Sequence, residues 1–429
     1  MSIYDNAGVV LIPSGTKAGT LYSVLPANGD GDFDHDRNLT TATRVNKDGL
    51  IEGVAADVPR LDYPLIDGVV QDCPALLLEP SETNYQIRSE EFDNSAYQKT
   101  RSSITANQIV SPDGTLTADL FTEDTSNNSH YLYDTLVVSA DSYTVSVFAK
   151  AKDRYKIKLR FDNVSTRRVA SFDLNSGSII STSNSTATIK QFPNNWYRCS
   201  ITVTATAETF YNFIHILDDS GNEGYAGDGS SGLYIWGSQI ERSSYLTSYI
   251  KTTSSQATRS ADVCNGSGTS AEFNDSEGVL FAEIAALAND GTIRRIAMSN
   301  SAANSLNRIE LNSVSNKVFG VTFTSGSNQA AISYTMPDAT TPFKMAYKYK
   351  NNDFALWVDG FKRGADSSGI TPTALVKLNF DNGVGGSDFY GETKQLMTFK
   401  TALTDSELET LTSWDSFNAM ATGQLYTIE

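Results

Sequence analysis

Apolar and polar residues alternate with a period of two along much of this chain, as in β-strands whose two faces meet different surroundings. The clearest example is the stretch 232–241, Gly-Leu-Tyr-Ile-Trp-Gly-Ser-Gln-Ile-Glu, which follows a glycine-rich turn. Leu233 and Ile235 point to one side of this strand, and Trp236 points to the other. Gly237 interrupts the alternation, and a glycine inside a strand predicts a β-bulge.

The same pattern predicts a β-sandwich over residues 83–262. Its strands are short, rich in Val, Ile, Thr and Tyr, and separated by turn signals such as Pro-Asp-Gly at 112–114. We expect the closing strand at 233–240 to pair with the upstream segments 75–84 and 90–92, which brings the ends of the sandwich together. The strands expected in this domain are 117–122, 130–138, 143–149, 156–161, 169–173, 187–191, 196–204, 210–217 and 233–240.

A second sandwich is expected over residues 269–415, after a polar stretch at 252–268 whose small residues predict a linker. Asp359-Gly360 predicts a tight hairpin turn. Thr404 and Glu407 form a capping-box pattern, flanked by Leu403 and Leu408 as a hydrophobic staple, which predicts a short helix. The strands expected here are 278–284, 294–298, 308–311, 318–323, 329–334, 343–350, 353–358, 376–380 and 391–399.

Both ends of the chain differ from the two sandwiches. Residues 1–82 hold short apolar pieces separated by turn residues, too few and too irregular to close a core. Such a segment orders against something else: the following domain, a sister subunit or a scaffold. Residues 416–429 are expected to form an extension that packs on a neighbour or frays. The fold class is therefore all-β, two consecutive antiparallel β-sandwich (jelly-roll) domains after an extended N-terminal segment.

The composition of the chain argues against some classes of binding partner. The chain has 50 acidic and 33 basic residues, a net charge of −17 and a pI near 4.6. Without a basic run, nucleic acid is not an expected partner, and an anionic membrane surface repels the chain. No apolar run could span a bilayer and no signal peptide precedes residue 15, so we expect synthesis in a cytoplasm. The three cysteines lie far apart and indicate neither disulfides nor a zinc site.

Four aspartates alternate along Gly-Asp-Gly-Asp-Phe-Asp-His-Asp, namely Asp30, Asp32, Asp34 and Asp36. An EF-hand loop starting at the first would need glycine at its sixth position and glutamate at its twelfth. His35 and Thr41 occupy those positions, so the match fails. In an extended conformation the carboxylates would share one side, and we favour a solvated turn with Arg37 nearby over a calcium site. No metal or cofactor is expected.

Enzyme chemistry finds little support in the sequence. The three histidines lie on unrelated segments, without metal-ligand or catalytic-triad spacing. Glycoside hydrolysis needs two carboxylates flanking a cleft, often close together on one strand. Glu283 stands alone in its strand, without a second acid two or four residues later. We therefore expect a protein without catalysis.

Aromatic side chains remain as a source of binding. Sugar rings stack on Trp and Tyr because their apolar C–H faces match a π-face. Trp357 alternates out of phase with the aliphatic residues of its strand, and Tyr131 and Tyr133 lie on one side of another. These three are the candidate glycan-binding residues. The alternative is that they are core, as most aromatic residues on sandwich strands are.

Longer stretches carry a family resemblance. LLLEPSETNYQIRSEEFDNSAY, SYTVSVFAKA, NNWYRCSITVTA and GLYIWGSQIERSSYLTSYI resemble the jelly roll of tailed-bacteriophage fibre, spike and other virion proteins, which is similar to carbohydrate-binding modules. FALWVDGFKRG and GETKQLMTFKTALTDSELETL resemble the concanavalin-A-like, laminin-G-like jelly roll. IPSGTKAGTLYSVLPANGDGDFDHDRNLTTATRVNKDGLIE resembles a segment that precedes such sandwiches in tailed-phage proteins.

The resemblance implies a virion structural protein attached to capsid or tail proteins through residues 1–82. It also implies a homo-oligomer, with a homotrimer as the expected form, and adhesion to host or surface glycans. Two alternatives stay open: a glycan-degrading tailspike, and a purely architectural part without a ligand. Whether attachment is to the head or to the tail is open as well.

Overall fold

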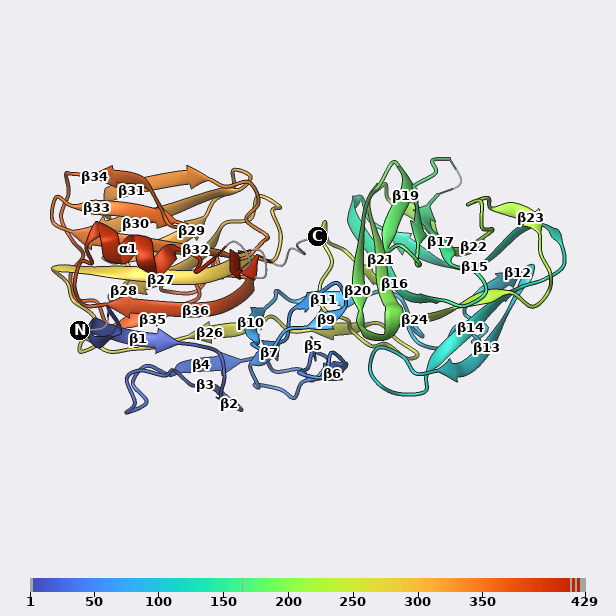
Figure 1. The fold of residues 1–429 in the computed structure, drawn as a ribbon, viewed down its shortest axis with the longest axis horizontal. Helices are drawn as coiled ribbons and strands as arrows, with labels where there is room; N and C mark the ends of the chain where they lie inside the picture. The colour runs from blue at the N-terminus through green and yellow to red at the C-terminus, as the bar shows by residue number, and fades with distance from the viewer. Residues whose placement is uncertain (1–2, 164, 417–418, 421–422, 425–429) are drawn as a thin grey trace.

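Two β-sandwiches lie side by side, with N-terminal strands running beneath and between them (Figure 1). The computed structural model describes residues 3–163, 165–416, 419–420 and 423–424. Every pairing between named strands in these residues is antiparallel, and the regular helices are short. The expected all-β class with two consecutive sandwiches is therefore confirmed. Within the same residues, no helix has the length and apolar character needed to cross a membrane.

The first sandwich is formed by two sheets. One has the order β12-β15-β22-β17-β18-β19, with β23 paired to β15; the other has the order β13-β14-β24-β16-β21-β20. The first sheet comprises β12 (Gln98–Thr100), β15 (Asn127–Val138), β22 (Glu208–Leu217), β17 (Lys156–Asp162), β18 (Val169–Asp173), β19 (Ser178–Ser183) and β23 (Gly224–Ala226). The second comprises β13 (Ser102–Ile109), β14 (Ala118–Glu123), β24 (Gly232–Glu241), β16 (Asp141–Ala151), β21 (Trp196–Ala205) and β20 (Thr186–Phe192).

The strand β24 confirms one expectation and corrects another. Gly237 has a φ of 62°, and the register with β16 breaks beside it, so the predicted bulge is present. However, β24 pairs with β14 and β16 and not with residues 75–78, which belong to the other sandwich. Contact with the upstream segment is made through residues 84–89 instead. The Ile240 N–H donates to Asn84 Oδ1 at 3.0 Å, the Tyr85 N–H to the Ile240 carbonyl at 2.8 Å, and the Ser238 N–H to the Ser89 carbonyl at 2.8 Å.

The second sandwich also has two sheets. Its larger sheet runs β34-β33-β32-β27-β36-β10-β7, with β1 paired to β36, and its smaller sheet runs β31-β30-β29-β28-β35. The larger sheet comprises β34 (Phe361–Asp366), β33 (Phe354–Val358), β32 (Phe343–Lys350), β27 (Glu277–Ala286), β36 (Gly391–Phe399), β10 (Ala75–Leu78), β7 (Arg60–Asp62) and β1 (Ala7–Leu11). The smaller comprises β31 (Ser327–Thr335), β30 (Lys317–Thr324), β29 (Leu306–Leu311), β28 (Arg294–Ser299) and β35 (Lys377–Asn379).

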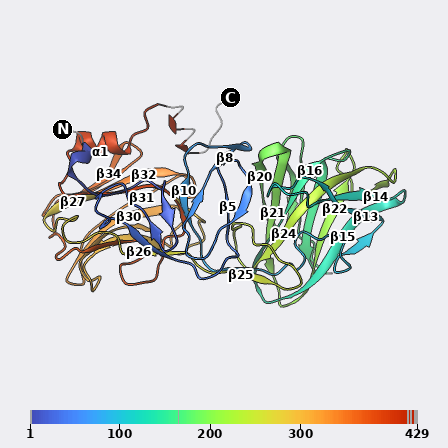
Figure 2. The ribbon, with the colours of Figure 1, turned by 90° about the horizontal axis from the view of Figure 1, so that it is seen from below.

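Local signals in this domain are confirmed. Asp359 and Gly360 both have positive φ, and they join β33 to β34 as the predicted hairpin turn. The helix α1 (Asp405–Thr412) begins with the capping box in which Thr404 and Glu407 bond reciprocally. It packs against β32, β33 and β34 on the face turned away from the sandwich interior (Figure 2). The expectation for 416–429 lies largely outside the described residues.

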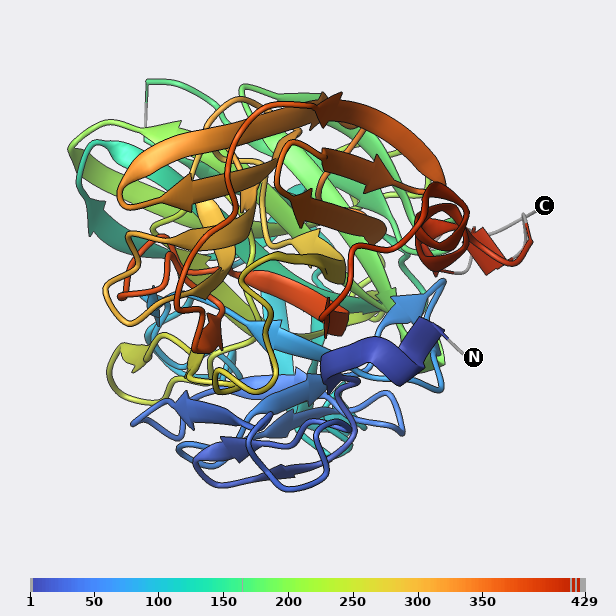
Figure 3. The same cartoon turned by 90° about the vertical axis from the view of Figure 1, so that its left-hand side faces the viewer.

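Residues 1–82 are built into both sandwiches, which is the first of the alternatives left open by the sequence. Within this segment, β1, β7 and β10 extend the larger sheet of the second sandwich. Side chains such as Phe33 and Leu76 are buried in that domain's core, and Val45 and Ile51 pack in a cluster with Phe148 of the first sandwich. Figure 3 shows these N-terminal strands layered under the second sandwich. The segment is therefore an integral part of the fold.

The stretch 252–268 connects the two sandwiches, as expected of a linker, and the structure shows that it is ordered. Its strands β25 (Ala257–Arg259) and β26 (Val263–Asn265) pair with β11 (Glu82–Asn84) and β4 (Phe33–Asp36) of the N-terminal segment. The remaining short pairs are β2 (Thr16–Lys17) with β3 (Thr20–Leu21), β3 with β4, β5 (Thr43–Val45) with β6 (Ile51–Gly53), and β8 (Leu65–Ile66) with β9 (Val69–Val70).

A buried ionic cluster joins these segments. Asp262 accepts from Arg37 Nη1 at 2.9 Å and from Arg60, and Glu79 accepts from Arg60 Nη1 at 2.5 Å. Arg259 lies 3.1 Å from Glu79. Each of the five side chains is at most 2% exposed. Two residues of the stretch 252–268, Arg259 and Asp262, are thus buried ion-pair partners. These ion pairs hold the stretch in place.

Candidate functional site

A ladder of aromatic rings covers part of the outer face of the first sandwich. Tyr131 and Tyr133 stand on β15, and Tyr211, Phe213 and His215 stand on the neighbouring β22. Strand register sets Tyr131 opposite His215 and Tyr133 opposite Phe213. The residues between them, Leu132 and Ile214, point into the core. Period-two alternation therefore places all five rings on the face away from that core.

The rings of this aromatic ladder touch one another in sequence. Ring centroids of Tyr131 and Tyr133 are 6.1 Å apart, and those of Tyr133 and Tyr211 are 6.0 Å apart. Phe213 lies 5.2 Å from Tyr133 and is stacked on Tyr211 at 5.8 Å. These are ordinary aromatic contact distances, so the rings support each other in place. The prediction that Tyr131 and Tyr133 lie together on one side is confirmed.

The tyrosines keep polar groups available. Among the described residues, no hydrogen bond is made by the hydroxyl of Tyr131, Tyr133 or Tyr211, and all three side chains are half-buried. Phe213 is less available, because the Arg160 guanidinium carbon lies 4.4 Å above its ring. The Tyr131 ring likewise has the Arg101 guanidinium carbon 5.7 Å from its centroid. Tyr133 and Tyr211 thus offer an apolar ring surface beside unpaired hydroxyls, which is the combination that binds a sugar ring.

Charged groups border one end of the ladder. His215 is 3% exposed, neither ring nitrogen has a hydrogen-bond partner among the described residues, and burial lowers its pKa to about 3. Glu223 lies near it; burial opposes the charge of this carboxylate, but hydrogen bonds from Arg167 and Lys158 lower its pKa to about 2. At neutral pH this end therefore carries a neutral imidazole beside a charged carboxylate with two cationic partners.

Trp357 is not a stacking platform, which corrects the expectation for this residue. Its side chain does face away from the sandwich interior, as its phase indicated, but it is only 6% exposed. It packs in the cluster under α1 with Phe281, Leu408 and Leu411. The alternation of a strand identifies the face of a side chain and leaves open what covers that face. Here a helix from the end of the chain covers it.

The four aspartates do not share one side. Asp34 and Asp36 are exposed on β4, but Asp30 and Asp32 lie in a preceding turn, where Asp32 Oδ1 accepts from the Ser23 N–H at 2.8 Å. Arg37, expected in a solvated turn, is buried on Asp262. Within the described part of the chain, no group of three or more His, Cys, Asp or Glu side chains could hold a metal ion.

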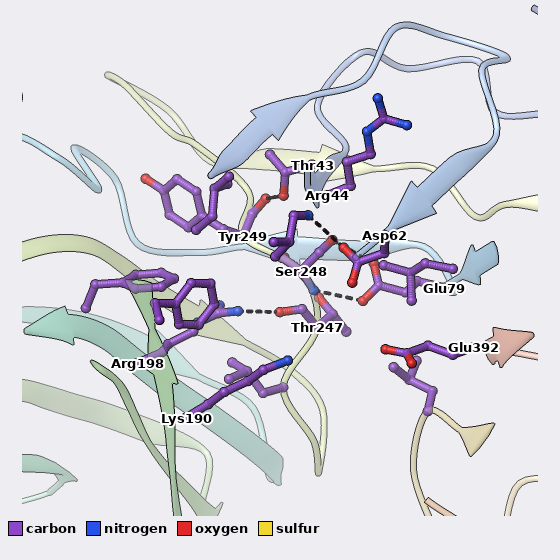
Figure 4. A pocket seen from close by; sticks show the side chains of 17 residues that line it. Thr43, Arg44, Asp62, Glu79, Lys190, Arg198, Thr247, Ser248, Tyr249 and Glu392 are labelled. Carbon is purple, nitrogen blue, oxygen red and sulfur yellow. Dashed lines mark hydrogen bonds between the residues drawn. The ribbon is translucent and has the colours of Figure 1, made fainter. Parts of the chain in front are cut away.

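An acid pair that sequence reasoning missed lies between the sandwiches. Asp62 on β7 and Glu392 on β36 line one pocket of about 180 Å³ (Figure 4). Burial, together with the negative charge of Glu392, raises the pKa of Asp62 to about 7. A search for two acids on one strand could not find this pair, because the two residues come from strands at opposite ends of the chain. By contrast, Tyr211 and Phe213 alternate in the sequence and could have been found.

Known structures resemble the chain only distantly. The CBM40 module of the Ruminococcus gnavus IT-sialidase, bound to α2,3-sialyllactose, is 13% identical over 33% of this chain and 84% of its own, with a TM-score of 0.28. Domains LG4–5 of the mouse laminin α1 chain are 12% identical over 68% and 92%, with a TM-score of 0.24. The Trypanosoma rangeli sialidase, in complex with the inhibitor DANA, is 9% identical over 96% and 84%, with a TM-score of 0.28.

Sequence comparisons give no further relative. No protein-family model matches the chain. No curated protein sequence matches it either. Scores of this size assign neither a family nor a ligand, so any function has to rest on the chain's own side chains.

Proposed function

We propose that the chain is a structural protein of a tailed-bacteriophage virion (a fibre, spike or decoration) whose first sandwich holds host or surface glycans without cutting them. The observation that carries the binding part is the aromatic ladder, with three half-buried tyrosines whose hydroxyls have no partner among the described residues. The virion part rests on the resemblance of residues 1–82 and of both sandwiches to tailed-phage proteins.

Binding at the ladder should be weak for one copy. Stacking on one or two tyrosine rings contributes about 1 kcal/mol per ring beyond area burial, and association itself costs several. A single site should therefore bind in the millimolar range. Many copies on one particle raise the effective concentration and make such sites useful for adhesion.

Substitution of two ladder tyrosines tests the binding. Tyr133→Ala with Tyr211→Ala should abolish the signal of a multivalent preparation on a glycan array, because both stacking surfaces are lost. The same change at an exposed tyrosine elsewhere, Tyr22→Ala, is the matched control and should bind like the parent. Glycan signal that persists in the double variant would contradict the proposal, provided both variants melt at the parent temperature.

Attachment through residues 1–82 has to use their exposed side chains, because the segment is part of the fold. Tyr22 is 41% exposed and Val24 49% exposed, and both lie in this segment. The combined change Tyr22→Ser and Val24→Ser should leave the chain folded and reduce its incorporation into particles. Normal incorporation would count against this docking surface. Deletion of residues 1–75 is unsuitable as a test, because it would remove the strands β1 and β7 from the larger sheet of the second sandwich.

Glycan hydrolysis is a second candidate, favoured by the pocket that holds Asp62 and Glu392. A carboxyl with a raised pKa beside a second carboxylate is the arrangement of a glycosidase acid and its partner. Against it, Asp62 is only 7% exposed, which leaves little access for a bond inside a glycan chain. Purified protein incubated with host envelope polysaccharide should release no reducing ends; release that is lost in Glu392→Gln would establish the second candidate.

A further inference from the structure

We propose that the pocket between the two sandwiches is a second ligand site, which takes one small polyhydroxy ring of the size of a monosaccharide. The site is distinct from the aromatic ladder and does not depend on it. Three separate parts of the fold supply its walls: Asp62 from the N-terminal segment, Lys190 and Arg198 from the first sandwich, and Glu392 from the second (Figure 4).

The charged side chains of the pocket face each other across open space. Figure 4 shows Lys190 and Arg198 extending from one side and Glu392 from the other, with their charged ends toward the gap. Lys190 and Glu392 form no hydrogen bond or ion pair among the described residues; the Lys190 ammonium only lies 6.0 Å from the Phe192 ring. A bound molecule could therefore contact both without displacing a protein partner.

Two buried side chains in the walls of the pocket, Arg198 and Asp62, could also contact a ligand. Arg198 is 6% exposed; its Nη1 donates to the Thr247 carbonyl at 2.7 Å, but its Nη2 has no partner among the described residues. Asp62 Oδ1 accepts from the Val45 N–H at 2.7 Å. An unpaired polar atom in a protein interior is costly, so Arg198 Nη2 is a position where an added hydrogen bond is favourable.

The chemistry of the walls selects the ligand. Donors stand on one side and carboxyl groups on the other, and a hydroxyl can accept from the former and donate to the latter. The lining also includes apolar side chains, among them Phe192, Leu246 and Leu287. A sugar ring combines a polar rim with apolar C–H faces. The volume of about 180 Å³ lies below the roughly 300–1,000 Å³ of pockets for drug-sized ligands, which limits the ligand to a single ring.

Ligand-observed saturation-transfer NMR on the full chain tests this site. The probes are D-glucose, D-galactose and N-acetyl-D-glucosamine, each as the free sugar and as its methyl glycoside. Signal from the free sugars alone would identify a free monosaccharide as the ligand, and signal from the glycosides would identify the end of a glycan. Glycine is added as a separate probe, because a zwitterion could also match walls of opposite charge.

The variants Glu392→Gln and Lys190→Gln should fold normally, because neither side chain forms a hydrogen bond or ion pair within the described part of the chain. We expect each to weaken binding of the responding sugar at least about tenfold, since a hydrogen bond to a charged group is lost. These measurements are made in the Tyr133→Ala, Tyr211→Ala background, in which the aromatic ladder no longer contributes to the signal. The proposal is overturned if, in that background, no sugar gives a signal at 50 mM, if glycine alone does, or if both pocket variants bind like their own parent.

Discussion

Neutralising Asp262 should destabilise the whole junction between the sandwiches. Its carboxylate is 1% exposed and takes hydrogen bonds from Arg37, from Arg60 and, at 2.9 Å, from the Glu79 N–H. Asp262→Asn keeps the volume of the side chain and removes only the charge. Arg37 would then lose the carboxylate that it pairs with, and Arg60 and Arg259 would be left with Glu79 between them.

The expected loss in the free energy of unfolding follows from this excess of buried positive charge. Breaking a buried ion pair by removing one partner typically costs roughly 3–5 kcal/mol, because it leaves an uncompensated charge in the interior. Asp262 contacts two of the three arginines, so we expect a value in the upper half of that range. The reduction should appear in unfolding of the N-terminal segment together with the second sandwich, because Arg60 lies on β7 of that sheet.

Urea titration followed by tryptophan fluorescence and by circular dichroism measures the free energy of unfolding. With two sandwiches the transition can split, in which case the midpoint of each step is compared. Asp141→Asn is the matched control: Asp141 pairs with Arg242 at 2.8 Å, but both side chains are more than 40% exposed, so the midpoint should barely move. A loss below about 1 kcal/mol in Asp262→Asn would refute the reasoning, because it would mean that the arginines are compensated without this carboxylate.

Three further predictions concern the core, pH and assembly. Trp357→Ala should lower the free energy of unfolding by about 3–5 kcal/mol, because it leaves a cavity under α1; a change under 1 kcal/mol would contradict its burial. Since the pKa of Asp62 is about 7 when folded and near 3.8 when unfolded, stability from this group falls as pH rises through that interval. Asp62→Asn should therefore melt higher than the parent at pH 8, and the gain should vanish below pH 4. Light scattering of the full chain should give a homo-oligomer, expected as a trimer; a monomer at high concentration would contradict it.

Local features of the fold could be predicted because the residues that decide them lie within a few positions of one another. The alternation around Tyr131 and Tyr133 determines their common face through the pleat of the strand. Gly237 at the bulge, Asp359-Gly360 in the hairpin and the Thr404–Glu407 capping box each need a backbone geometry that their own chemistry supplies. The structure confirms each of these predictions.

Long-range features could not be predicted, because strand edges and exposed faces accept any partner of suitable shape. Residues 75–78 carry the apolar pattern of a buried strand, which does not say which sandwich they join; pairing with β36 decided this. Trp357 has the phase of an outward side chain, and only the packing of α1 buries it. Likewise, Asp62 and Glu392 become an acid pair only because strands from both ends of the chain lie in one sheet, with the first sandwich closing the pocket above them.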